Sequence, residues 1–184
     1  NVTSTTSSWT PISDFWDNLS ISCITYDPNN TNTFYVGTGE SQTAITIYRE
    51  SSGRGAGIWK STDGGKNWKQ INNGLPAPQH RGRIGIDLCR EQPNTLYILL
   101  DNYEIAKKAK KGDLDNYQRQ KKDVIKGATV YRSDNAGESW KQVSGQTEKM
   151  KKFMMRHSAT YGWVFGQIRV DPKDPETIWT LGIW

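Results

Sequence analysis

The sequence predicts an all-β protein built from repeated four-stranded antiparallel units. Three observations lead to this prediction. Short segments rich in Val, Ile, Thr, Tyr and Trp alternate with polar turn residues, which is the pattern of β-strands. These segments recur in the same order along the chain. The core shows no sustained helical period, although "YEIAKKAKK" (103–111) could form a turn or two of helix.

The first repeat is an Asp, a polar turn, an Asn-Thr or Glu-Thr pair and an apolar strand. It occurs as "DPNNTNTFYVGTGE" (27–40), "DLCREQPNTLYILLDN" (87–102) and "DPKDPETIWTLGIW" (171–184). A short alternating run precedes each copy: "CITYD", "RIGID" and "QIRVD". A second repeat matches "GIWKSTDGGKNWKQI" (57–71) with "TVYRSDNAGESWKQV" (129–143). The two repeats together define one unit of four strands.

The predicted strands of the first unit lie near 21–26, 33–39, 57–61 and 67–72. Those of the second lie near 83–87, 95–100, 128–133 and 139–143. Units of this size are typical of β-propeller blades. The expected organisation of residues 1–184 is a blade end at 7–14, a blade at 20–73, a blade at 82–144 with an insertion at 102–127, and the start of another blade at 166–184. Since a propeller needs at least ~4 blades, we expect missing segments or another chain to supply the rest.

The stretch "STDGGKNW" (61–68) is similar to an Asp-box, with the pattern Ser/Thr-x-Asp-x-Gly-x-Thr/Ser-aromatic, and "SDNAGESW" (133–140) matches it in the second unit. The chain therefore resembles the Asp-box (BNR-repeat) β-propellers of the sialidase, sortilin and xyloglucan-hydrolase types, and most of all the bacterial sortilin-like and BNR-repeat glycosyl-hydrolase-like proteins. It departs from the pattern at Asn67 and Asn135, and Ala136 stands where the first box has Gly. Asn can still accept a hydrogen bond, so we expect the second turn to be weaker rather than absent.

We expect both boxes to be structural turns rather than sites. The first does not open a helix as a phosphate-binding loop does, and Asp63 is a single carboxylate where a calcium loop needs several. Its carboxylate can instead accept backbone N–H groups of its own turn, while Gly64 allows positive φ. The residues assigned to the two turns are Ser61, Asp63, Gly65, Trp68, Ser133, Asn135, Gly137 and Trp140.

The long insertions are expected at the opposite end of the strands from these turns, and loops on a rigid scaffold commonly carry binding. Glu40 and Asp101 end the second strands of the two units and are the candidate acid and base of a glycoside hydrolase, with loop caps or ion-pair partners as the alternative. The resemblance supplies no catalytic residue that can be matched to this sequence. Candidates for a ligand-binding face are His80, Arg81, Arg83, Asn102, Tyr103, His157, Tyr161 and Trp163.

The net charge of +5 is concentrated in two segments. Residues 104–126 hold eight Lys or Arg and four acids, and residues 149–156 hold four basic residues and no acid. The basic insertion has one Tyr and no nucleic-acid-binding motif, so we expect no nucleic-acid partner but a solvated insertion, or alternatively docking onto an acidic protein surface. Cys23 and Cys89 show no zinc-site spacing and can be bridged or free. No segment is long and apolar enough to span a membrane.

The resemblance implies a secreted or envelope-associated protein, extracellular, periplasmic or on the cell envelope, although the chain shows no signal peptide. It implies a module that binds a protein or peptide ligand, since sortilin-type propellers bind such ligands. The alternative is a polysaccharide-active glycoside hydrolase of the Asp-box propeller type, with a glycan as the ligand. Neither function requires a cofactor or a metal ion.

Overall fold

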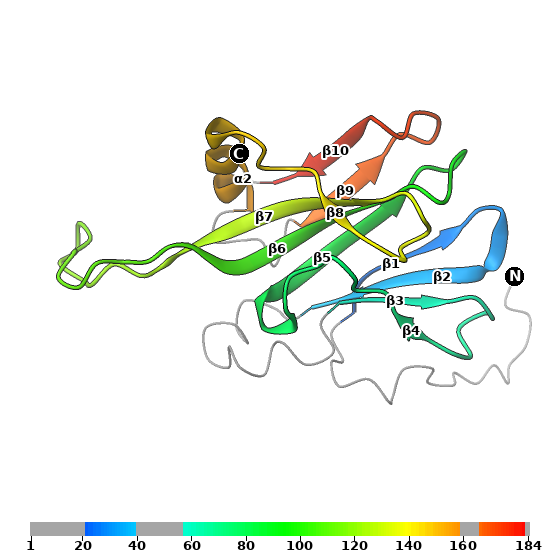
Figure 1. The fold of residues 1–184 in the computed structure, drawn as a ribbon, viewed down its shortest axis with the longest axis horizontal. Helices are drawn as coiled ribbons and strands as arrows, with labels where there is room; N and C mark the ends of the chain where they lie inside the picture. Colours follow the sequence, from blue (N-terminus) through cyan, green and yellow to red (C-terminus); the bar gives the residue numbers. More distant parts are fainter. Residues whose placement is uncertain (1–20, 40–56, 159–165, 183–184) are drawn as a thin grey trace, which may run out of the picture.

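The computed structural model describes residues 21–39, 57–158 and 166–182. The strands form three antiparallel sheets (Figure 1). The first sheet contains β1 (Ile21–Asp27), β2 (Asn30–Thr38), β3 (Gly57–Ser61) and β4 (Lys69–Gln70). The second contains β5 (Arg81–Leu88), β6 (Leu96–Lys107), β7 (Val124–Ser133) and β8 (Lys141–Gln142). A third contains β9 (Gln167–Val170) and β10 (Ile178–Leu181).

Each four-stranded sheet has its strands side by side in chain order, β1-β2-β3-β4 and β5-β6-β7-β8, as propeller blades do. Phe34 pairs with Ser61 in the first sheet, and Leu96 pairs with Ser133 in the second. The two sheets therefore have the same register relative to the repeated turns. The predicted all-β fold with two whole blades and part of a third is confirmed. The predicted blade end at 7–14 lies outside the described residues.

Two hydrophobic clusters hold the sheets together. The first joins both blades and includes Tyr35 and Ile58 of the first sheet with Ile84, Leu100 and Trp140 of the second. The second joins the second blade to β9, through residues such as Leu99, Val130 and Ile168, and to Met154 of the helix α2 (Glu148–Ser158). Because neighbouring sheets share a cluster, each sheet buries its apolar face against the next one along the chain.

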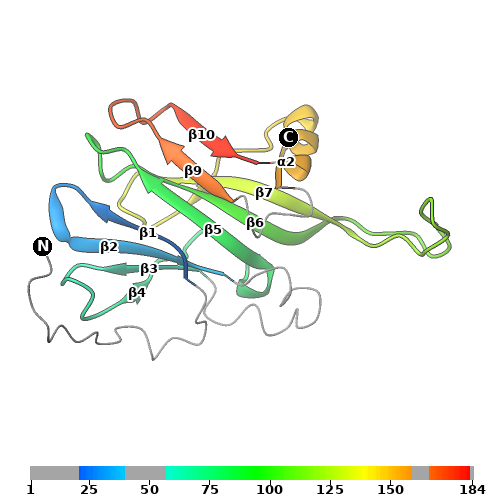
Figure 2. The same ribbon diagram turned by 180° about the vertical axis from the view of Figure 1, so that it is seen from behind.

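The turns and the described insertion at 102–127 lie at opposite ends of the strands, as expected (Figures 1 and 2). The β1–β2, β3–β4, β5–β6 and β9–β10 turns lie at one end, which we call the turn end. The β6–β7 connection lies at the other, the insertion end, with the short 3-10 helix η1 (Pro78–His80). The β6–β7 connection extends far beyond the sheets in both views.

The expectation of helix in 103–111 was wrong, because β6 continues as a strand to Lys107 and pairs there with Val124. The Lys and Ala residues favour a helix locally, but pairing with β7 satisfies the backbone and overrides that preference. The described helix lies instead at Glu148–Ser158, in the second basic segment, and packs against β7. Its buried residues Met154 and His157 are three apart, which places them on one face.

The two cysteines are free thiols, with Cys23 partly buried and Cys89 buried. Desolvation raises the pKa of Cys23 to about 11, so this thiol stays protonated at neutral pH. In the part of the chain that the structure covers, no helix is long and apolar enough to cross a membrane.

Candidate functional site

The turn between β3 and β4 is held by side chains of its own sequence. The Ser61 hydroxyl donates to Oδ1 of Asp63 at 2.8 Å and accepts the Gly65 N–H at 2.9 Å. Asp63 also accepts the backbone N–H of Asn67 at 2.9 Å and its side-chain Nδ2 at 2.6 Å. These bonds, that of the Asn67 N–H first, lower the pKa of Asp63 to about 2. The carboxylate is thus engaged within the turn itself.

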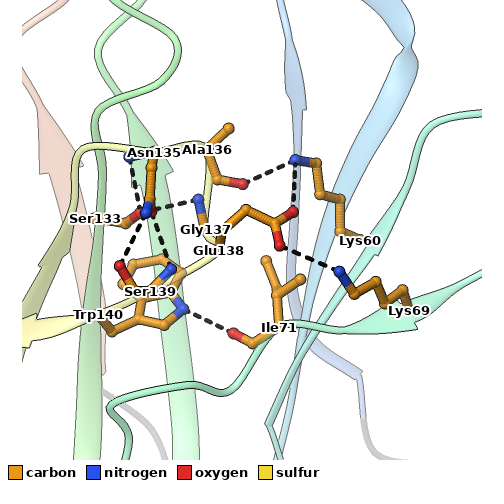
Figure 3. Close-up of polar contacts among 10 residues, drawn as sticks. All are labelled: Lys60, Lys69, Ile71, Ser133, Asn135, Ala136, Gly137, Glu138, Ser139 and Trp140. Carbon is orange, nitrogen blue, oxygen red and sulfur yellow. Dashed lines mark hydrogen bonds and ion pairs between the residues drawn. The ribbon is translucent and has the colours of Figure 1, made fainter.

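The turn between β7 and β8 repeats this arrangement with an amide in place of the acid (Figure 3). Asn135 Oδ1 accepts the Ser133 hydroxyl at 2.9 Å and the Ser139 N–H at 3.0 Å. Asn135 Nδ2 donates to the Ser139 hydroxyl at 2.9 Å, where Asp63 accepts from Asn67. The donor and acceptor have exchanged places, so both turns keep their hydrogen bonds although their sequences differ.

The second turn also links the two blades (Figure 3). The Trp140 indole donates to the Ile71 carbonyl at 2.7 Å, and its backbone N–H donates to Asn73 at 2.8 Å. Lys60 donates to the Ala136 carbonyl at 3.0 Å, and Glu138 lies 3.1 Å from Lys69. These contacts place the turn in the interface between the blades. They occupy its polar groups, so few of these groups are available to a ligand.

A cation–π pair occupies equivalent positions in the two blades. Lys60 lies 5.6 Å from the ring centroid of Tyr35, its cross-strand partner, and Arg132 lies 5.5 Å from that of Tyr97. Arg132 also binds Glu176 of the β9–β10 turn at 2.6 Å. The turn end is therefore a series of blade-to-blade links.

At the insertion end, the base of the β6–β7 hairpin brings together several of the candidate residues. Arg81 is the cross-strand partner of Asn102, and its Nε donates to the Pro76 carbonyl at 2.6 Å. The Tyr103 ring packs against Gly82, where a Cβ would lie 2.4 Å from the ring. Tyr103 donates its hydroxyl to Asp101 at 2.5 Å. Arg81, Asp101 and Asn102 are all buried, so this group is part of the interior rather than an open rim.

Asp101 is the most perturbed carboxyl of this group. Its side chain is 6% exposed, and burial raises its pKa to about 6, although the bond from Tyr103 opposes the shift. A carboxyl with this pKa holds its proton below about pH 6. Among the described residues, Tyr103 is the group that donates a hydrogen bond to the Asp101 carboxyl.

Two residues that the sequence did not single out complete the group. Glu104 lies 2.7 Å from Lys126 on the opposite strand, and it accepts from Asn102 Nδ2 at 3.1 Å. Burial raises the pKa of Glu104, but the bonds from Lys126 and Asn102 outweigh it and leave the pKa below its ordinary value. Strand pairing across the hairpin makes this contact, which a helix at 103–111 would not make.

His80 ends η1 directly before Arg81, and its charge contributes to lowering the pKa of Glu104, so it borders this group. The other candidates lie apart from it. Arg83 is half-buried on β5, where it lines a cavity of about 220 Å³ between β1, β5 and β9. His157 lies at the end of α2 and is 5% exposed, with its ring centroid 5.4 Å from that of Phe153. Glu40, Tyr161 and Trp163 lie outside the described residues. The two candidate carboxylates, Glu40 and Asp101, therefore cannot be placed against each other.

The part of the hairpin beyond Lys107 and Val124 is ordered by its acidic and amide side chains. Asp115 binds Arg119 at 2.9 Å, Asp113 binds Lys121 at 2.9 Å, and Asp123 accepts the Ala109 N–H at 2.8 Å. Gln120 donates to the carbonyls of Lys110 and Asp113 and accepts the Gly112 N–H. With Glu104 bound to Lys126, each of the four acids of the segment is engaged within the hairpin.

Most of the lysines of the hairpin have no such partner. Within the described part of the chain, no ion pair involves Lys107, Lys108, Lys110, Lys111 or Lys122. Four of these lysines, together with Lys121, line a cavity of about 270 Å³ near the tip. The acids stabilise the hairpin, and the unpaired ammonium groups present its positive charge to solvent.

The helix α2 adds a second set of cations where it packs on β7, at the base of the hairpin. Thr147 caps its first turn by accepting the Met150 N–H at 3.1 Å. Lys151 pairs with Glu148 at 2.6 Å, while no described ion pair involves Lys149, Lys152 or Arg156. Phe153 is 50% exposed among these cations. The helix therefore presents a basic surface with an apolar residue in it.

The described residues contain no group of three His, Cys, Asp or Glu side chains placed to hold a metal ion. No protein-family model matches the chain, and no curated protein matches it.

Several solved structures of GH74 enzymes are similar to the chain. An ancestral GH74 enzyme is 19% identical, with a TM-score of 0.44, over 71% of this chain and 14% of that one. The GH74 enzyme of Niastella koreensis is 18% identical, with a TM-score of 0.36, over 89% and 28%. The GH74 xyloglucanase of Xanthomonas campestris is 13% identical, with a TM-score of 0.34, over 89% and 27%. The chain thus spans between 14% and 28% of the length of these enzymes.

Proposed function

We propose that this chain is part of a propeller that binds an acidic protein or peptide through its insertion end. The binding region is a basic surface that we call the basic insertion surface. It consists of Lys107, Lys108, Lys110, Lys111 and Lys122 of the hairpin and Lys149, Lys152 and Arg156 of α2. A secreted, sortilin-like Asp-box protein is the type of molecule that we propose for it, in line with the two repeated turns.

One observation carries this proposal. The acids of the hairpin are all used in contacts within it, whereas five of its lysines have no ion-pair partner among the described residues. An ordered hairpin holds these cations in place before a ligand arrives, which lowers the ordering cost of binding. Clustered charge of one sign also steers an oppositely charged ligand toward the surface.

The test uses a short fluorescent peptide of Glu and Asp as the probe and measures anisotropy over a range of salt concentrations. The wild-type protein should bind it with an affinity that falls as salt rises. Changing Lys108, Lys110 and Lys122 to Gln should weaken binding about tenfold or more at low salt. The matched control changes Lys66, Lys141 and Lys173, which are exposed outside this surface, to Gln and leaves the same net charge. Equal weakening by both variants would overturn the proposal.

A glycoside hydrolase is the second candidate function. The observation in its favour is the raised pKa of Asp101, because a general acid requires a raised pKa. Glu40 would be the second carboxyl. A glycan-hydrolysis screen of the protein that contains this chain tests this function, with Asp101→Asn and Glu40→Gln combined. Hydrolysis that the double variant abolishes would favour the hydrolase, and hydrolysis that it retains would remove these two residues from the reaction.

A further inference from the structure

A cavity of about 380 Å³ lies between β7, β8 and α2, beside the basic insertion surface. Its lining includes the buried Ala128, Thr129, Ser144 and Met154. The helix closely approaches the strand at Gly127, where a Cβ would lie 3.2 Å from the Met155 Cα. The next residue, Ala128, has a small side chain, so space remains beside this close contact.

The lining favours an apolar group. Met154 and Met155 line the cavity from α2, and methionine side chains adapt to differently shaped apolar groups. The volume lies within the range of about 300–1,000 Å³ that is usual for ligand pockets. Phe153 and Met150 on the same helix are about half exposed, which extends the apolar surface outward.

The two charged groups of the lining are cations. Lys126 comes from the hairpin base and Lys151 from α2. Each is exposed and has one carboxylate partner, Glu104 at 2.7 Å and Glu148 at 2.6 Å. Ion pairs as exposed as these contribute little, so a ligand carboxylate can replace either partner at small cost.

We infer that this cavity is the anchor pocket for one bulky apolar side chain of an acidic peptide, whose carboxylates bind the cations around it. This inference rests on the proposed function and adds the sequence feature that the ligand must carry. A few anchor residues in desolvated pockets dominate the affinity of most interfaces, and aromatic residues are common among them. Charge alone brings any acidic chain to the surface, and the pocket selects one with an apolar anchor.

The experiment compares two short Glu/Asp peptides that differ at one central residue, Trp in one and Ala in the other. The wild-type protein should bind the Trp peptide about tenfold more tightly. The chain contains three methionines, so methyl-labelled methionine gives three NMR signals. The signals of Met154 and Met155 should shift with the Trp peptide and remain in place with the Ala peptide. The variants Met154→Leu and Met155→Leu show which signal belongs to which methionine.

An Ala106→Trp variant is designed to obstruct the cavity, because Ala106 lines it and is exposed, so the fold should accept the larger side chain. It should remove the preference for the Trp peptide and retain binding of the Ala peptide. The matched control is Ala77→Trp, an exposed position that lines neither this cavity nor the one near the hairpin tip. Equal wild-type affinity for both peptides would overturn the anchor pocket and leave the proposed function standing. Failure of both peptides to bind would overturn both proposals.

Discussion

At the scale of single residues, Asp101 shows how position changes the chemistry of a side chain. From the sequence alone, it is an acid at the end of a predicted strand, and nothing distinguishes its pKa from that of an exposed aspartate. In the structure it is buried beside Tyr103, and burial raises its pKa to about 6 from 3.8. The same burial limits contact between this carboxyl and a substrate.

The pKa of Asp101 predicts a pH dependence of stability. Because its pKa is higher in the folded than in the unfolded protein, the folded state holds this proton more tightly. This contribution is fully present below about pH 4 and is lost as the pH rises through about 6. The loss amounts to about 1–3 kcal/mol in the free energy of unfolding. Urea denaturation between pH 4 and 8 measures it.

Asp101→Asn is the matched variant for this measurement. The Asn side-chain oxygen can still accept the Tyr103 hydroxyl, but the side chain has no charge to desolvate. This variant should be more stable than the wild-type protein at pH 8 and should lack the decline between pH 4 and 6. The same decline in both proteins would contradict the origin that we assign to it.

At the scale of elements, the two repeated turns differ at a position that requires a left-handed backbone. Gly64 has a φ of 74°, and its equivalent Ala136 has a φ of 54°. A residue with a Cβ is strained in this region, whereas glycine is not. The second turn therefore stores backbone strain that the first avoids.

This difference predicts opposite effects of two reciprocal substitutions. Ala136→Gly should stabilise the protein and Gly64→Ala should destabilise it, each by about 1 kcal/mol. Gly64 is a suitable position, because within the described ranges a Cβ there would have Asn32 Oδ1, at 3.6 Å, as its one neighbour within 4 Å. Thermal denaturation of both variants measures the effects. A loss of stability in Ala136→Gly would show that backbone strain does not govern this turn.

The hairpin is the element where local preference and the observed structure differ most. Lys and Ala favour a helix in 103–111, but β6 and β7 continue their pairing to Lys107 and Val124. Beyond that point, Asp113, Asp115 and Gln120 hold the chain through hydrogen bonds. The insertion is therefore a hydrogen-bonded arm that extends the second blade.

At the scale of the whole molecule, the blades depend on one another. The first hydrophobic cluster contains residues of both sheets, and the Trp140 indole donates to the Ile71 carbonyl of the neighbouring blade. Gly74 lies at the same contact, where a Cβ would be 2.1 Å from the Trp140 carbonyl oxygen. The backbones of the two sheets thus meet directly, without side chains between them.

Trp140→Phe should destabilise the protein by about 1–2 kcal/mol, because the substitution removes the donor to the buried Ile71 carbonyl. Trp68→Phe is the matched control, since the Trp68 indole donates to Gly65 within its own turn. Because the Trp68 indole is partly exposed, the loss of its hydrogen bond to Gly65 should lower the stability less. Chemical denaturation compares the two variants. An equal or larger effect of Trp68→Phe would contradict the role of Trp140 between the blades.

The sequence by itself determined the repeat, the strands and the end of the sheets at which the insertions lie. These features are local: period-two runs, Asx-type turns and glycines specify them without reference to distant parts of the chain. Six of the eight predicted blade strands start within two residues of the observed starts. The fourth strands are shorter than expected, and in the second blade the Trp140 backbone N–H donates to Asn73 of the neighbouring blade instead of to β7.

The tertiary structure alone decided which residues meet at the insertion end. Arg81, Asn102 and Tyr103 are separate candidates in the sequence, and strand pairing places them together and buries much of the group. Pairing of β6 with β7 also makes residues 103–107 a strand, and the packing of α2 on β7 makes the cavity beside it. Contacts between residues far apart in the chain depend on how sheets and helix pack, and no local pattern encodes that packing.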